Sequence, residues 1–341
     1  MMKNIFNLSL KELEEYLEQN NEKKYIAKII YEWLYERFIP SFFDITNISK
    51  DLRDKLNKDF KIELLEIKNR EITRDTIKYL FKLNDGSLIE TVIMGHDYGN
   101  SICISSQIGC DMGCAFCASG RLKKVRDLTA GEMVSQIMTA IHNDHIKINS
   151  VVVMGIGEPL LNYDNVLKFI RIINDPKGLA IGARHITVST CGIIPGIKAL
   201  ALEKMQINLA LSLHAPNDML RTKLMPINKA YSINKVLKEI KEYIAKTNRR
   251  VTIEYVMINN INDNKKQAIL LSKILKGMNV YVNLIPLNEI PNSKYQKSSE
   301  DRIKDFYNIL KQNKINVTVR REFGGQIAAA CGQLRASEVQ K

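Results

Sequence analysis

The sequence predicts an α/β protein, in which a partial parallel barrel of six strand–helix units follows a small helical domain and a short β region. From residue 101 onwards, short apolar segments alternate six times with amphipathic helical segments. Before residue 60, apolar residues recur at helical spacing. Between residues 61 and 94, alternating segments flank Asn84-Asp85-Gly86, which is typical of a hairpin turn. We therefore expect domains at residues 1–60, 61–99 and 100–341.

The first domain should contain three helices. Apolar residues repeat every three or four positions in two stretches within residues 8–37, and Pro40 ends the second stretch. A third helix is expected over residues 50–60. Trp33 lies on the apolar stripe of the second helix, so we interpret it as a core residue.

The barrel strands are expected at residues 101–105, 151–155, 185–189, 208–213, 251–258 and 280–287. Helices are expected near residues 129–145, 163–174, 194–204, 232–246, 264–276 and 299–313, with a closing strand at 317–323. Thr129 and Glu132 have the spacing of a capping box at the start of the first of these helices. Ligands of such folds bind at the carboxyl ends of the strands, so the loops after the strands should carry the site.

Composition limits the possible classes of protein. The 341 residues have a formal net charge of +13 and contain no apolar run long enough for a membrane span. The N-terminal segment lacks a signal-peptide pattern, and six cysteines are too few for a disulfide framework, so we expect a cytoplasmic protein without a membrane partner. Residues 1–95 carry 16 Lys and Arg against 17 Asp and Glu. The positive charge therefore belongs to the rest of the chain, which favours a polyanionic partner.

Cys110, Cys114 and Cys117 form a CxxxCxxC motif in the loop after the first barrel strand. Three thiolates suit a [4Fe-4S] cluster in which the fourth iron stays open for a ligand. This spacing is typical of the radical S-adenosylmethionine (SAM) enzymes, in which the open iron binds SAM. The alternative is a zinc knuckle with Cys103 as its fourth ligand, because structural zinc takes four ligands.

Further polar and small residues follow the other strands. Gly157 and Glu158 suit close backbone approach and an acceptor for an amino group, although an ordinary turn would look the same. Ser189, Ser212, His214 and Asn288 could bind ribose or carboxylate oxygens, or could be caps, turn residues and a half-buried histidine. Two further thiols could face the same cavity or be small buried hydrophobic side chains, namely Cys103 on the first strand and Cys331 between glycines. Cys191 is interpreted as structural.

With these residues in place, the chain resembles the RlmN and Cfr group of radical SAM RNA methyltransferases over essentially its whole length. The matching motifs are LSLKELEEYL, SICISSQIGCDMGCAFCAS, MGIGEPLLNYDNV, RHITVSTCGIIPGI, NLALSLHAPND, RTKLMPINKAY, VNLIPLN and AACGQL. The resemblance implies a cluster on the three motif cysteines, a methyl-carrying Cys331, a resolving Cys103 and a proton acceptor at Glu90. It also implies SAM contacts at Gly157, Glu158, Ser189, Ser212, Leu213, His214 and Asn288.

The resemblance further implies methylation of adenosine at C2, in 23S rRNA at the peptidyl-transferase centre and 3′ of the anticodon in tRNAs. In the mechanism that the resemblance implies, two SAM molecules would be consumed per turnover. One would methylate Cys331, and the other would yield a 5′-deoxyadenosyl radical that abstracts hydrogen from the S-methyl group. Cys103 would then release the product by forming a disulfide with Cys331. We expect a monomer that receives electrons from a flavodoxin or ferredoxin.

Two alternatives differ in chemistry. A Cfr-type enzyme would methylate C8 of the same rRNA adenosine and confer antibiotic resistance, although Pro159 in the GIGEP motif favours the C2 enzyme. A zinc-stabilised RNA-binding protein would have no catalytic activity.

Overall fold

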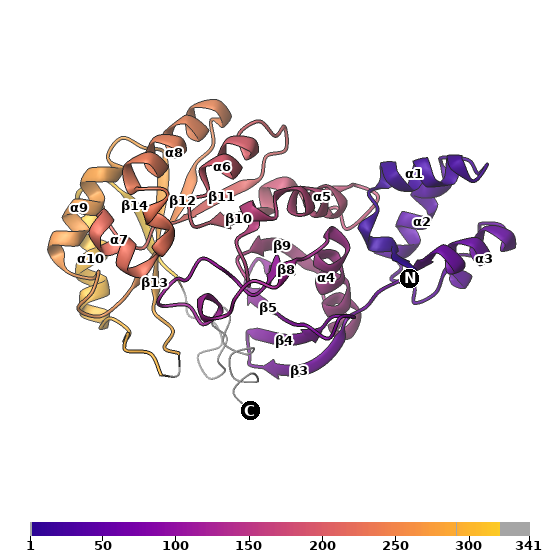
Figure 1. The fold of residues 1–341 in the computed structure, drawn as a ribbon, viewed down its shortest axis with the longest axis horizontal. Coiled ribbons are helices and arrows are strands. Elements are labelled where there is room, and N and C mark those ends of the chain that lie inside the picture. Colours follow the sequence, from indigo (N-terminus) through magenta and orange to yellow (C-terminus); the bar gives the residue numbers. More distant parts are fainter. Residues whose placement is uncertain (1, 291, 321–341) are drawn as a thin grey trace.

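A mixed sheet of ten strands forms the centre of the computed structural model, which describes residues 2–290 and 292–320 (Figure 1). The strand order is β14-β13-β12-β11-β10-β9-β6-β5-β4-β3. From β6 to β14 all neighbours are parallel. These strands are β6 (Gly99–Ile104), β9 (Ile148–Val153), β10 (Ile186–Thr190), β11 (Asn208–Ser212), β12 (Val251–Met257), β13 (Val280–Pro286) and β14 (Asn316–Val319). The predicted parallel α/β fold is confirmed.

Helices connect the parallel strands and pack along the outer side of the curved sheet (Figure 1). They are α4 (Ala130–Asp144), α5 (Tyr163–Asn174), α6 (Ile194–Leu200), α8 (Ile233–Thr247), α9 (Lys265–Leu275) and α10 (Glu300–Gln312). Helix α4 begins with the predicted capping box, in which Thr129 and Glu132 each bind the other's main-chain N–H. A further short helix, α7 (Asp218–Leu224), follows β11 and has no counterpart in the sequence prediction.

The predicted hairpin region is part of the main sheet. β3 (Glu66–Ile72), β4 (Thr76–Lys82) and β5 (Leu88–His96) form an antiparallel meander, and β5 pairs with β6. Ile93 and Ile102 face each other across this pair, and both are almost fully buried. Pairing with β5 gives β6 a second hydrogen-bonded neighbour, so the first barrel strand is not an exposed edge.

Three helices precede the sheet and lie at one end of the molecule (Figure 1), namely α1 (Leu10–Gln19), α2 (Ile26–Tyr35) and α3 (Lys50–Asp59). Their contacts with the barrel involve α5, whose Lys168 binds Glu12 of α1 at 2.7 Å, and α4. The Gly131 N–H donates to the Asn7 side chain at 2.9 Å, and the Asn4 amide donates to Ser135 Oγ at 3.2 Å. These polar contacts fix the helical segment beside α4.

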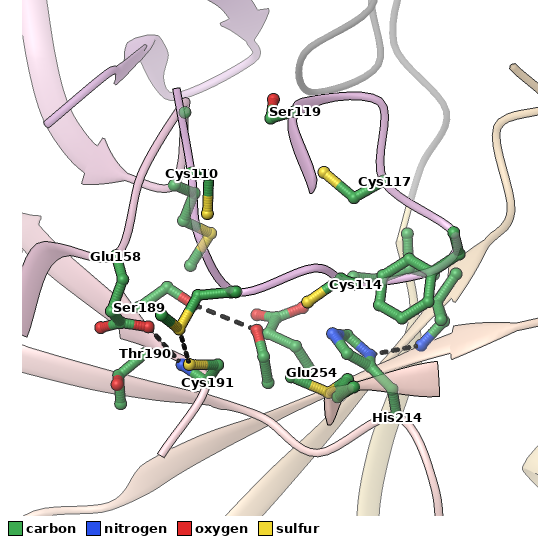
Figure 2. A pocket seen from close by; sticks show the side chains of 18 of the residues that line it. Cys110, Cys114, Cys117, Ser119, Glu158, Ser189, Thr190, Cys191, His214 and Glu254 are labelled. Atoms are coloured by element: carbon green, nitrogen blue, oxygen red, sulfur yellow. Dashed lines mark hydrogen bonds between the residues drawn. The ribbon is translucent and has the colours of Figure 1, made fainter. Parts of the chain in front are cut away.

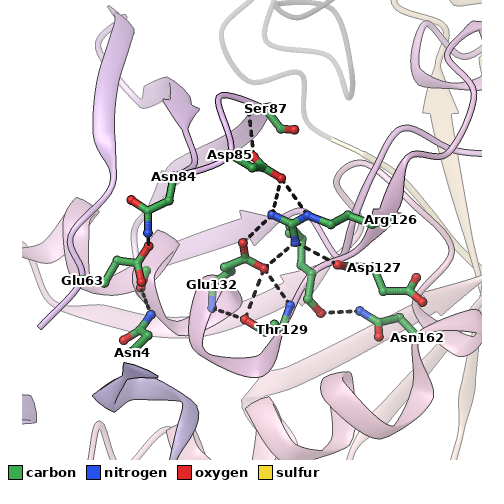
Figure 3. Close-up of polar contacts among 12 residues, drawn as sticks. Asn4, Glu63, Asn84, Asp85, Ser87, Arg126, Asp127, Thr129, Glu132 and Asn162 are labelled. Atoms are coloured by element: carbon green, nitrogen blue, oxygen red, sulfur yellow. Dashed lines mark hydrogen bonds and ion pairs between the residues drawn. The ribbon is translucent and has the colours of Figure 1, made fainter. Parts of the chain in front are cut away.

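Arg126 joins three segments next to the cysteine loop (Figure 3). Its guanidinium binds both carboxylate oxygens of Glu132, at 2.7 and 2.8 Å, and Asp85 at 2.8 Å. Arg126 lies on β8 (Arg126–Asp127), which pairs with β7 (Gln107–Ile108) and so closes the loop between them. The contacts of Arg126 therefore tie the end of the cysteine loop to helix α4 and to the β4–β5 turn.

As for membranes, none of the helices in the described ranges combines the length and the apolar character that a membrane span requires.

Candidate active site

A cavity of about 240 Å³ opens at the carboxyl ends of the parallel strands (Figure 2). Its walls come from the cysteine loop and from the loops after β9 to β13, as expected for ligand sites in this type of sheet. The predicted site residues on its wall are Cys110, Cys114, Cys117, Gly157, Glu158, Ser189, Ser212, His214 and Asn288. Residues far apart in the sequence therefore share one pocket.

The cysteine loop holds its shape through its own main chain. The Cys110 N–H donates to the carbonyl of Leu122 at 3.0 Å, and the Cys117 N–H donates to that of Cys114 at 3.1 Å. Helix α7 supports the loop from outside, because its Leu224 carbonyl accepts the N–H of Ala115 at 2.9 Å. The loop therefore presents its three thiols toward one space instead of dispersing them (Figure 2).

The environment of the thiols suits an iron–sulfur cluster. Burial raises the pKa of Cys110 to about 11 and also raises the pKa of Cys114. These thiols would bind as thiolates only with a compensating positive charge, which iron ions supply. Three soft sulfur donors on one loop fit a cluster with one open iron. These residues could therefore hold such a group.

Glu158 is a buried carboxylate with defined hydrogen bonds. Its Oε2 accepts the N–H of Cys191 at 2.8 Å, and its Oε1 accepts the N–H of Leu160 at 3.1 Å. Burial raises the pKa of Glu158, and the hydrogen bonds from Cys191 oppose this rise. The preceding Gly157 has φ +110°, and a Cβ there would lie 2.6 Å from the side chain of Gln107. Only glycine fits this turn, which brings the carboxylate to the cavity wall.

His214 is a buried neutral ring on the opposite wall of the cavity (Figure 2). Its Nδ1 accepts the N–H of Val256 at 3.0 Å, so its proton belongs on Nε2. Burial lowers the pKa of His214 to about 3. The ring packs edge-on against Phe116 of the cysteine loop, with centroids 4.9 Å apart. His214 can therefore donate one hydrogen bond without bringing a charge.

Leu213 is placed differently from the other predicted contacts. Its side chain is fully buried in the core and is absent from the cavity wall. Its main chain lies between Ser212 and His214, and its N–H donates to the carbonyl of Glu254 at 3.1 Å. Any role of Leu213 in ligand binding must therefore involve the main chain.

Sequence reasoning missed Arg221. Its side chain is fully buried, and every hydrogen bond recorded for it in the described ranges goes to a neutral oxygen. The acceptors are the carbonyls of Cys191 (2.6 Å), Ser212 (3.3 Å), Leu213 (3.2 Å) and Tyr231 (3.3 Å) and the side-chain oxygen of Asn228 (3.0 Å). Arg221 thus joins the ends of β10 and β11, where predicted site residues lie. It belongs to the RTKLMP segment, which gave no sign of burial.

Glu254 was also missed. It is buried on β12, and its Oε2 accepts a hydrogen bond from Asn283 at 2.9 Å. It lines both the active-site cavity and a second cavity inside the barrel. The strand pattern VTIEYVMI contains the signal, since a single acidic residue within an apolar strand needs a polar environment.

Glu90 and Cys103 lie on the inner face of the sheet. Thr91 bonds Gln136 of helix α4 on the outer face, so Glu90 points the opposite way. Cys103 pairs with Val152, which lines the cavity inside the barrel. Both residues are buried. Cys331 lies outside the described residues.

Comparisons with known proteins agree with this architecture. A model of the radical SAM superfamily matches residues 104–271, and a model of the ribosomal RNA large subunit methyltransferase N-terminal domain matches residues 3–62. A crystal structure of a radical SAM methyltransferase from Sphaerobacter thermophilus superimposes with a TM-score of 0.94 at 41% identity, covering 98% of this chain and 99% of that one. Fold and site therefore define a radical SAM enzyme.

Relatives identify the family within this superfamily. The probable dual-specificity RNA methyltransferase RlmN of Spiroplasma citri is 51% identical, covering 98% of both chains. The protein of the same name from Acholeplasma laidlawii is also 51% identical, covering 98% of this chain and 99% of its own. The chain belongs to the RlmN family.

Proposed function

We propose that the protein methylates C2 of an adenosine in 23S rRNA and of the adenosine 3′ of the anticodon in tRNAs, by way of an S-methylcysteine. The observation that carries the proposal is the shared cavity, in which three cysteines of one loop face Glu158, Ser189, Ser212 and His214 on the strand ends. The family membership supports the same activity.

Cys110, Cys114 and Cys117 would hold a [4Fe-4S] cluster, with SAM beside it. When bound, the cluster and SAM supply one-electron chemistry that polar side chains cannot perform. The protein residues would bind and orient the cluster and SAM. Glu158 offers a buried carboxylate to an ammonium group, and His214 offers a neutral N–H. Ser189, Ser212 and Asn288 offer uncharged polar groups on the same wall.

Glu90 and Cys103 support the covalent part of the proposal. The ring of adenine is electron-poor at C2, so a methyl group must be delivered there by a carrier. We assign this carrier to Cys331. Glu90 would accept the C2 proton, and Cys103 would release the product by forming a disulfide with Cys331. Glu90 on β5 and Cys103 on β6 both lie on the inner face of the sheet, which is compatible with these roles. The proposal therefore requires two SAM molecules per turnover, one to methylate Cys331 and one for the one-electron chemistry.

RNA is the proposed partner, and the target base must leave its stack to reach the cavity. The N-terminal helices (residues 1–60) would recognise RNA shape, and residues 100–341 would form the catalytic core, joined by residues 61–99. A small electron-transfer protein of the flavodoxin or ferredoxin type would supply the reducing electron. We expect the protein to act as a monomer in the cytoplasm.

An anaerobic reaction with SAM, a reductant and protein-free rRNA or tRNA tests the proposal. We expect 2-methyladenosine after digestion of the RNA and analysis of the nucleosides by mass spectrometry. Formation of 8-methyladenosine would show the Cfr-type reaction instead. RNA without any methylated adenosine, from a protein with full iron content, would contradict the proposal.

A further inference from the structure

A third cavity, of about 720 Å³, lies at the amino ends of the parallel strands and shares Arg184, Thr187, Asn208 and Thr252 with the cavity inside the barrel. Its wall contains three arginines and otherwise only uncharged polar side chains. The lining residues are Arg184, Thr187, Gln206, Asn208, Thr247, Asn248, Arg249, Arg250, Thr252 and Asn279. No carboxylate and no apolar side chain contributes to this wall within the described ranges. We call it the amino-end cavity.

The arginines of this cavity have neutral partners. Arg184 Nε donates to Gln206 at 2.5 Å, and Arg249 Nη2 donates to Asn208 at 2.9 Å. The guanidinium of Arg250 lies over the ring of Tyr281, 4.8 Å from its centroid. In the part of the chain that the structure describes, Nη1 of Arg249 is buried without a hydrogen-bond partner. Several guanidinium donors therefore remain available to an anion.

The end of helix α8 explains this charge only in part. The helix ends at Thr247, and cations near a helix C-terminus are favoured by its dipole. Arg249 and Arg250 come directly after this helix and benefit from the dipole. Arg184, however, precedes β10 and approaches from a different segment. Burial lowers the pKa of Arg249, and the like charge of Arg184 nearby contributes further to this decrease.

The position of the cavity separates it from the active site. Arg184, Arg249 and Asn279 stand just before β10, β12 and β13, whereas the cysteine loop lies beyond the other ends of these strands. β12 has seven residues, which at about 3.3 Å per residue places the two sites roughly 20 Å apart. A ligand in the amino-end cavity therefore cannot be the reacting base.

The wall favours a phosphate group over an acidic protein. Protein interfaces have apolar and aromatic centres, and this wall has none in the described residues. Interfaces with nucleic acids are polar and strongly positive. An arginine guanidinium can donate two parallel hydrogen bonds to the oxygens of one phosphate. Each bond is stronger than a neutral one because the acceptor is charged.

We propose that Arg184, Arg249 and Arg250 bind a backbone phosphate of the RNA substrate at the end of the barrel opposite the active site. The proposal rests on the proposed function and extends the RNA contact surface beyond the N-terminal helices and the cavity mouth. A free phosphate ion would use the same chemistry, and the experiment separates the two.

The test measures binding of an unmodified tRNA transcript to the full-length holoenzyme over a range of KCl concentrations. One variant combines Arg184→Gln with Arg249→Gln. The other carries only Arg250→Gln, at an exposed position. The matched control is Lys241→Gln with Lys273→Gln, which removes the same charge from exposed positions on α8 and α9. Thermal unfolding of each variant checks that it folds, and Arg250→Gln keeps the test valid if the double variant is unstable.

The salt dependence distinguishes the outcomes. Each lost phosphate contact should lower the slope of log K against log salt concentration by about one. We expect a decrease of about one for Arg250→Gln, about one to two for the double variant, and none for the lysine control. Equal slopes for all proteins, or equal decreases in the control, would overturn the proposal. Millimolar phosphate that stabilises the wild type while the tRNA slopes stay equal would indicate a free phosphate site and would also overturn it. If the wild type binds tRNA with these differences yet forms no methyladenosine, the proposed function fails and the phosphate site stands.

Discussion

Replacing Arg221 by methionine should weaken both the fold and SAM binding. The substitution keeps much of the side-chain volume but removes five hydrogen bonds, three to buried oxygens and two to partly buried ones. A hydrogen bond to a charged group contributes about 1.5–3 kcal/mol. The variant also avoids the cost of burying the guanidinium, so the contributions do not add up in full. We expect a loss of about 3–5 kcal/mol in the free energy of unfolding.

For a chain of 341 residues, whose unfolding entropy is about 0.7 kcal/mol/K, that loss corresponds to a decrease of roughly 4–7 °C in the thermal midpoint. The effect on the SAM site should be larger than the effect on overall stability, because the carbonyls of Cys191, Ser212 and Leu213 that lose their hydrogen bonds lie at the ends of β10 and β11. SAM affinity, measured by equilibrium dialysis on reconstituted protein, should therefore decrease at temperatures where the variant is folded.

Arg221→Lys is the conservative control for this prediction. Lysine keeps the positive charge but has one nitrogen, which cannot reach oxygens on three separate segments. Its midpoint and SAM affinity should lie between those of the wild type and of Arg221→Met. If Arg221→Met binds SAM as the wild type does and unfolds within about 1 °C of it, the positioning role is wrong.

The remaining predictions concern the thiols and His214. Replacing any one of the three loop cysteines with alanine should abolish cluster binding and production of 5′-deoxyadenosine; full iron content in such a variant would exclude that cysteine as a ligand. Cys103→Ala should accumulate a covalent protein–RNA adduct on a denaturing gel, whereas Cys331→Ala should form none; wild-type turnover by Cys103→Ala would refute its resolving role. His214 has a folded pKa of about 3 against an ordinary 6.5, so unfolding takes up a proton between these values and stability falls as the pH drops. His214→Gln should make the unfolding free energy in urea less dependent on pH, by up to about 1.4 kcal/mol per pH unit between pH 4.5 and 6; parallel curves would contradict the burial argument.

The periodic parts of the chain could be predicted from the sequence because their signals are local. Helix α5 occupies the predicted residues 163–174, since its apolar spacing is regular and its charges suit the helix dipole, with Asp164 in the first turn and Arg171 in the last. Helix α7 was missed because seven residues give too short a pattern. The sequence also could not predict that β3 to β5 join the main sheet. A hairpin pattern does not indicate which other strand its edge strand will pair with, and here β5 pairs with β6.

The residues of the candidate site also divide into those that the sequence predicted and those that it did not. Most of the predicted residues lie on one cavity wall because parallel strands bring their carboxyl ends together. Arg221 was missed because its importance depends on burial, which appears only after the chain has folded, whereas the acidic residue within the apolar strand VTIEYVMI was a signal for Glu254. A charged residue in a helix pattern normally reads as a solvent-exposed side chain.

The most direct test of the account is the fate of a deuterated methyl group. SAM with a trideuterated methyl is supplied to the wild type with tRNA or rRNA, and the methyladenosine is analysed by mass spectrometry. Transfer through an S-methylcysteine that loses one hydrogen atom predicts a methyl group with two deuterium atoms, and the third in 5′-deoxyadenosine. A methyl group that keeps all three deuterium atoms would show direct transfer from SAM and would contradict the account.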